Sequence, residues 1–130
     1  MPGYDASLFD PPAPVAYVTL RNPANGAAWV DVPMLLDSGA DVSLVPKDSI
    51  ERLGLTLLSD GQYELVSFGG YVSLAAPVSL ELLFLGRVYR GQFLLADQEW
   101  GILGRNILNT ATLVLNGPQL TWGITPSGQR

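Results

Sequence analysis

Residues 34–46 read MLLDSGADVSLVP, and this stretch decides both the expected fold and the expected chemistry. An apolar run ends in Asp37, Ser38 and Gly39, and a second apolar run follows from Val42. The residues just before Asp37 are apolar on both faces of the expected strand, which predicts a strand buried on both sides. Burying a carboxylate there without a partner costs several kcal/mol, which favours a chemical role for Asp37. The alternative is an ordinary Asx-type turn, because Asp-Ser-Gly is a common turn sequence.

The composition narrows the chemistry further. The chain has 130 residues, enough for one domain, and it contains no cysteine and no histidine. Disulfides, thiol nucleophiles and cysteine-ligated zinc are therefore excluded, as are Ser-His-Asp triads and every imidazole base. A serine–lysine pair would have to use Lys47, the only lysine. Carboxylates are the leading candidates for acid–base chemistry near neutral pH.

Charge and hydropathy bear on the expected partners. Seven basic side chains stand against twelve acidic ones, a formal charge of −5, and the arginines are scattered. A nucleic-acid partner would need clustered positive charge, so none is expected. No apolar stretch approaches the length of about 18 residues that a membrane span needs, and no membrane partner is expected. The first residues lack the basic region of a signal peptide, which favours a cytoplasmic protein.

Glycines and prolines divide the chain into short apolar segments typical of strands. The proline-rich residues 1–14 are expected to be an extended tail, residues 15–125 the folded lobe, and residues 126–130 a second tail. Helical patterns are short: Pro46–Leu53, stopped by Gly54, and one turn at Gly104–Leu108. The expected fold is all-β with one or two short helices. Its strands are 15–21, 28–36, a hairpin over 62–74, a hairpin over 78–95 turning at Gly86-Arg87, and a hairpin over 112–122 turning at Asn116-Gly117.

Two motifs together resemble a known family. Residues 35–41 read LLDSGAD, and residues 102–108 read ILGRNIL. In that order and at that separation they resemble the retropepsin-type aspartic proteases, which include the retroviral proteases. The resemblance runs from about Val15 to Trp122. It implies a single-lobe, closed β barrel that works as a symmetric homodimer and cleaves a peptide or protein substrate without a metal or other cofactor.

The resemblance also implies roles for individual residues in and near the loop of residues 37–41, the acid loop. Asp37 would be the catalytic carboxylate. Ser38 would brace the two loops across the dimer, and Gly39 would offer its carbonyl to the substrate backbone. Asp41 would contact the substrate main chain and form an ion pair with Arg105, either in the same chain or in the other subunit.

More distant residues would enclose the substrate. A hairpin tip at Phe68, Gly69 and Gly70 would act as a flap, because glycine lets backbone N–H groups approach an extended peptide. Trp100 and Ile102 would wall the side-chain pockets. An ordinary hairpin turn and an ordinary buried strand are the alternatives for these two groups.

The number of motifs sets the expected assembly. Aspartic proteolysis uses two carboxylates that share one proton, and the chain has one Asp-Ser-Gly. A two-fold axis beside Asp37 would supply the second carboxylate, so the leading hypothesis is an aspartic endopeptidase that acts as a homodimer. The first alternative is a catalytically silent module of the same fold that dimerises or binds peptides. The second is an unrelated small β barrel, which would be a monomer.

Overall fold

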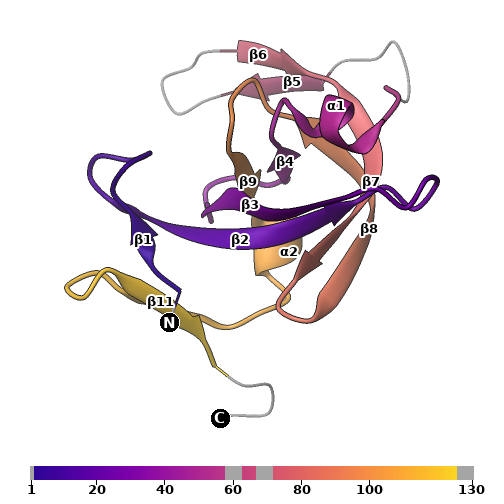
Figure 1. Ribbon diagram of the computed structural model, residues 1–130. Coiled ribbons are helices and arrows are strands. Elements are labelled where there is room, and N and C mark those ends of the chain that lie inside the picture. Colours follow the sequence, from indigo (N-terminus) through magenta and orange to yellow (C-terminus); the bar gives the residue numbers. More distant parts are fainter. Residues whose placement is uncertain (1, 58–62, 67–71, 126–130) are drawn as a thin grey trace.

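A closed ring of strands forms the body of the molecule (Figure 1). The computed structural model describes residues 2–57, 63–66 and 72–125. The strands of the ring and its extension are β1 (Tyr4–Asp5), β2 (Ala13–Arg21), β3 (Ala28–Leu36), β4 (Leu44–Val45), β7 (Pro77–Phe84), β8 (Arg87–Leu95) and β9 (Gly101–Leu103). Their order is β1–β2–β3–β9–β4–β8–β7, and β2 also pairs with β7, which closes the barrel. The expected all-β barrel is thereby confirmed.

The core fills the inside of this barrel, as the alternating sequence pattern predicts. Val78, Leu80 and Leu82 on β7 are buried, whereas Ser79 between them is exposed. Strand side chains point alternately to the two faces of a sheet, so one face of β7 packs inward. The other fully buried large side chains come from β2, β3, β4, β9 and the helices: Val15, Val18, Leu20, Val32, Met34, Val45, Leu53, Leu103 and Ile107.

Two short helices complete the lobe. Helix α1 (Ser49–Leu53) begins three residues after the expected start at Pro46. The reason is that Ser49 turns back on Pro46: its N–H and its hydroxyl both donate to the Pro46 carbonyl, at 3.0 and 2.7 Å. The helix ends at Gly54, whose φ of 63° is left-handed, as predicted. Helix α2 (Arg105–Leu108) is the expected turn. In the described part of the chain, no helix has the length and hydropathy to cross a membrane.

Two hairpins stand outside the ring. Strands β5 (Tyr63–Val66) and β6 (Val72–Ala75) pair antiparallel, as do β10 (Leu113–Asn116) and β11 (Thr121–Ile124). The β5–β6 pair is the expected flap hairpin. Its expected tip, residues 68–70, lies outside the described residues.

The turns of two hairpins differ from the expected ones. Phe84 pairs with Arg87, so the β7–β8 turn consists of Leu85 and Gly86 rather than Gly86 and Arg87. Both have positive φ, 52° and 76°, as a type I′ turn requires. In the other hairpin Asn116 pairs with Thr121, so the loop is 117–120 and the expected two-residue Asn-Gly corner is wrong. The Asn116 side chain instead accepts a hydrogen bond from the Gln119 N–H, at 3.2 Å.

The first residues, expected as an extended tail over residues 1–14, pair with strands of the lobe. Tyr4 and Asp5 pair with Pro14 and Ala13 of β2. The Tyr4 N–H also donates to the Leu120 carbonyl, at 2.9 Å, and the Trp122 N–H donates to the Pro2 carbonyl, at 3.1 Å. The N-terminal residues and the β10–β11 hairpin therefore form one continuous hydrogen-bonded layer. A strand of two residues between prolines leaves no periodic pattern, so the sequence gives no sign of β1.

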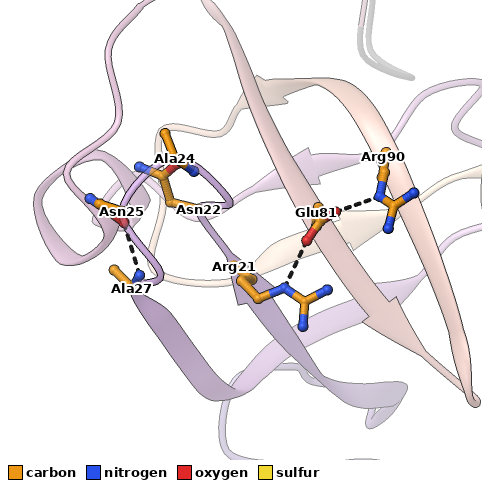
Figure 2. Close-up of polar contacts among 7 residues, drawn as sticks. All are labelled: Arg21, Asn22, Ala24, Asn25, Ala27, Glu81 and Arg90. Atoms are coloured by element: carbon orange, nitrogen blue, oxygen red, sulfur yellow. Dashed lines mark hydrogen bonds and ion pairs between the residues drawn. The ribbon is translucent and has the colours of Figure 1, made fainter.

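Glu81 ties three strands of the barrel together (Figure 2). It lies opposite Arg21 of β2 and Arg90 of β8 in the two strand registers. Arg21 Nε donates to one carboxylate oxygen at 2.7 Å, and Arg90 Nε donates to the other. The hydrogen bonds from Arg90 and from Arg21 hold the pKa of Glu81 below its ordinary value of 4.5. The triad therefore favours the ionised carboxylate and fixes the β2–β7 pairing that closes the ring.

Replacing this carboxylate is expected to change how stability depends on pH. A lowered pKa stabilises the folded state above about pH 4.5, and that contribution is lost as the pH falls through the lowered value. Glu81→Gln should therefore reduce the free energy of unfolding near neutral pH and reduce it less in acid. Urea unfolding at a series of pH values measures this, with Glu99→Gln, an exposed site, as the matched control. A deficit that is constant over the whole pH range would contradict the role given to the triad.

Candidate active site

Asp37 directly follows β3, in the middle of the sheet. Strand β3 runs parallel to β9, with Leu36 opposite Leu103, and the Asp37 N–H extends this ladder by donating to the Leu103 carbonyl at 3.0 Å. On its other side β9 pairs with β4, where Leu44 lies opposite Ile102. The chain thus leaves β3 at Asp37, loops over the end of β9 and returns as β4. The expected burial of this strand on both faces is wrong: Val32 and Met34 are buried in the core, whereas Pro33 and Leu35 on the other face are partly exposed.

The acid loop is a tight turn built on the Asp37 side chain. The Gly39 N–H donates to Asp37 Oδ1 at 2.9 Å, and the Ala40 N–H donates to the Asp37 carbonyl at 3.1 Å. The Asx-type turn and the chemical role are therefore compatible. An added Cβ at position 39 would lie 3.1 Å from Asp37 Oδ1, so any larger residue there would push the Asp37 carboxylate by a few tenths of an ångström. Asp37 is half-buried, while Ser38 and Gly39 are exposed.

Gly104 and Arg105 of the second motif hold the acid loop in place. The Arg105 N–H donates to the Ala40 carbonyl at 2.8 Å, and Arg105 Nη1 donates to the Ser38 carbonyl at 2.7 Å. Gly104 packs so tightly that a Cβ would meet the Val42 carbonyl oxygen at 2.2 Å. Glycine and arginine at these positions are explained by close backbone approach and by two clamping hydrogen bonds.

Sequence reasoning missed Ser43, which connects the two motifs. Its side chain is buried, its hydroxyl donates to Asn106 Oδ1 at 2.7 Å, and it accepts the Gly104 N–H at 2.9 Å. A serine between two apolar residues, Val42 and Leu44, was the available signal, because a buried hydroxyl needs partners. Ser43 acts by positioning, and it fixes the register between the loop and α2.

The ion pair expected between Asp41 and Arg105 is absent within one chain. Among the described residues the ion pairs are those of Glu81, and Arg105 instead donates to the Ser38 carbonyl. An ion pair with the exposed Asp41 would gain little, because solvent screens exposed charges. The Ser38 carbonyl, by contrast, lies within hydrogen-bond distance of the Arg105 guanidinium. Pairing of Asp41 with Arg105 of the other subunit stays a prediction.

The expected pocket residues, Trp100 and Ile102, lie just before and within β9, the strand next to the one that leads to Asp37. Ile102 lies opposite Leu35, and both are partly exposed, whereas their neighbours Met34 and Leu103 point into the core. Trp100 comes directly before β9, in a bend of the chain, and its place in a pocket stays a prediction. Trp100 is half-buried. The edge of one ring meets the face of the other in its pair with Phe9, with centroids 4.7 Å apart and an interplanar angle of 64°.

Known proteins share this sequence pattern and this fold. Residues 18–107, more than half of the chain, match the family model described as aspartyl protease. Among solved structures the fold resembles that of the EIAV protease complexed with the inhibitor HBY-793, with a TM-score of 0.56 and 24% sequence identity. The match covers 75% of this chain and 86% of that one. The two sequence motifs, the closed barrel and the clamped acid loop have a common explanation: the chain belongs to the aspartyl protease family.

Proposed function

We propose that the protein is an aspartic endopeptidase whose catalytic pair consists of Asp37 from two copies of the chain. The observation that carries the proposal is the fixed, half-buried carboxylate at the end of β3, in a loop that Leu103 and Arg105 hold from the opposite motif. Pre-organised groups accelerate reactions because they need no reorganisation during the chemical step. One acid loop per chain supplies half of the pair, so a second copy must supply the other half.

The pair would cleave a peptide bond by activating water. Two adjacent carboxylates cannot both ionise easily, so they hold one proton between them. The ionised Asp37 takes a proton from water while the water oxygen bonds to the scissile carbonyl carbon. The protonated Asp37 gives its proton to the carbonyl oxygen. As the C–N bond breaks, that hydroxyl proton returns to a carboxylate and the amine nitrogen receives a proton from the pair. The products are a carboxylic acid and an amine.

Exposed residues of the acid loop would orient the substrate. Gly39 and Asp41 are both exposed beside Asp37, so the Gly39 carbonyl and the Asp41 carboxylate are open to main-chain N–H groups of an extended peptide. Main-chain contacts of this kind add a peptide to a site as an extra strand, largely independent of its sequence. The hydroxyl of Ser38, also exposed, would bond across the two-fold axis to brace the paired loops.

The β10–β11 hairpin supplies a surface on which the second copy would dock. Trp122 anchors the hairpin: it is buried, and its Nε1 donates to the Val15 carbonyl at 3.0 Å. Large apolar side chains are exposed on both faces of the hairpin and on the β7–β8 turn, and Leu85, Val114 and Ile124 help to line a pocket of about 420 Å³. Large exposed apolar patches mark interaction sites, and the proposed mechanism requires one between identical chains. The exposed side chains are Leu85, Val114, Leu115, Leu120 and Ile124.

Digestion of a peptide library, together with the molar mass in solution, tests the proposal. We expect cleavage by a dimer, with activity highest at acidic to mildly acidic pH, where the carboxylate pair holds one proton. A rate that stays flat from about pH 4 to about pH 9 would argue against a shared proton. Peptide binding without cleavage by a dimer would favour the silent module. A monomer at all concentrations would contradict both readings.

A further inference from the structure

The β10–β11 hairpin lies in a part of the chain that carries no charge. Residues 106–129 include no Asp, Glu, Lys or Arg, although the whole chain has a net charge of −5. Two copies of such a chain repel each other over most of their surfaces, and like charges that meet in an interface oppose binding. A basic partner would gain its attraction from the acidic surface elsewhere. The uncharged hairpin therefore suits a second copy of the same chain.

Strand β10 is the free edge of the layer that the hairpin forms with the N-terminal residues. Strand β11 pairs with β10 on one side, and on its other side the Trp122 N–H donates to the Pro2 carbonyl. In the described part of the chain, β10 pairs with β11 alone. Figure 1 shows the hairpin, in yellow, beside β1 and outside the ring. Proteins commonly protect such an edge with charges or prolines, but β10 reads LVLN and has neither.

The hydrogen bonds within the hairpin determine which backbone groups of β10 face the open edge. The Thr125 N–H donates to the Thr112 carbonyl at 2.9 Å. Because the two sides of an antiparallel strand alternate, Thr112 and every second residue after it bond to β11. The N–H and carbonyl groups of Leu113 and Leu115 therefore point away from β11. They are free to bond to another strand.

We infer that β10 pairs antiparallel with β10 of the second copy, with Val114 opposite Val114 of the partner subunit at the two-fold axis. In this register Leu113 lies opposite Leu115 of the partner subunit, and the outward N–H and carbonyl groups of both residues are used, in four hydrogen bonds. Centring the pairing on Leu113 or on Leu115 would use the groups of only one of them within the strand. The inference rests on the proposed function, which requires a second copy.

The same pairing covers apolar side chains that the hairpin leaves exposed. Val114 is 54% exposed and Leu115 is 58% exposed in one chain. Residues directly opposite each other in an antiparallel pair have adjacent side chains on one face. Val114 would therefore pack on its own copy, and Leu115 on Leu113 of the partner subunit. The backbone bonds fix the register, and the side chains add apolar burial to it.

Disulfide formation in single-cysteine variants tests the register, because the chain has no cysteine of its own. Val114 and its copy would form a non-hydrogen-bonded pair, in which Cα atoms lie about 4.5 Å apart. A disulfide joins Cα atoms about 4.4–6.8 Å apart. Under mild oxidation at micromolar concentration, Val114→Cys should therefore become a disulfide-linked dimer. Non-reducing electrophoresis and mass spectrometry measure the linkage.

Leu115→Cys is the matched control, since the two neighbouring residues are similarly exposed. In the inferred register Leu115 is diagonal to its own copy, at about 7–8 Å, which a disulfide does not bridge without movement of the backbone. Its linkage should be at least about tenfold slower than that of Val114→Cys. Both variants should keep the unfolding midpoint of the wild-type protein, because both positions are exposed.

Leu115→Pro provides a second measurement that does not depend on oxidation. The Leu115 N–H faces the open edge, so its loss removes no bond within the hairpin, and proline is tolerated at such edge positions. In the inferred dimer it removes one hydrogen bond from each copy, and the dissociation constant should rise at least about tenfold. Sedimentation measures that constant, and the unfolding midpoint checks the fold.

The outcomes separate this inference from the proposed function. Linkage of Leu115→Cys as fast as that of Val114→Cys would overturn the inferred register. A cleaving dimer that links at neither position, or a folded Leu115→Pro protein with an unchanged dissociation constant, would overturn the edge pairing and leave the proposed function standing. If the proposed function fails instead, Val114→Cys links in the inferred register but the linked dimer cuts no peptide.

Discussion

Asp37→Asn is expected to reduce peptide cleavage below detection, a loss of at least about a thousandfold, because an amide neither ionises nor shares a proton. Asparagine has the same shape, and its side-chain oxygen still accepts the Gly39 N–H hydrogen bond that closes the acid loop. The variant should therefore keep its fold and its dimer. Peptide-library digestion measures the loss, and sedimentation and thermal unfolding check that assembly and stability are unchanged.

Mixing the variant with wild-type chains sharpens this test. If subunits exchange and both copies of Asp37 are needed, an equal mixture holds about one quarter fully active dimers, and its activity should be about one quarter of that of the same total amount of wild type. If each chain worked alone, about half of the activity would remain. Full activity of the Asp37→Asn protein by itself would remove Asp37 from the mechanism.

Leu115→Asp should separate the dimer and abolish cleavage with it. The side chain is 58% exposed in one chain, so an aspartate there is solvated in the monomer and costs little stability. In the proposed dimer it would place two charges in an apolar contact, which is strongly unfavourable. At micromolar concentration we expect the molar mass to halve and kcat/KM to fall about a hundredfold or more.

A matched substitution tells the hairpin apart from the rest of the surface. Val30 on β3 is 61% exposed and lies outside the β10–β11 hairpin, so Val30→Asp makes the same chemical change elsewhere. It should leave both mass and activity near those of wild type. If Leu115→Asp stays dimeric and active, the two copies meet through another face, and the hairpin must be given up as the docking surface.

The sequence predicted those parts of the fold that depend on local patterns. Strand β3 has the expected bounds, Ala28–Leu36, and β7 and β8 form the expected hairpin over residues 78–95. The β7–β8 turn was misplaced by one residue because glycine tolerates either turn position, and nothing local reveals that Leu85 adopts a positive φ. The start of α1 was misplaced because a proline is compatible with the first position of a helix but does not show that a helix begins there.

The candidate site was predictable as two motifs, but their contacts were not. The motifs indicate that Asp37 and Arg105 belong to the site. The side chain of Arg105, however, donates to a backbone carbonyl, and residue types do not indicate which carbonyl a side chain will bind. The contact of Phe9 with Trp100 joins residues from nearly opposite ends of the chain, and a proline-rich segment gives no periodicity from which to infer it. Long-range contacts of this kind depend on closure of the whole barrel.

The contacts that hold the acid loop affect when Asp37 reaches its final position during folding. The loop at Asp37 is held by backbone and guanidinium groups of Leu103 and Arg105, more than sixty residues later in the sequence. Contacts between distant residues form late, because closing a long segment costs entropy before it yields interactions. A chain in which residues 103–105 have not yet reached the acid loop therefore lacks the contacts that hold Asp37, and the proposed activity requires that these contacts form first.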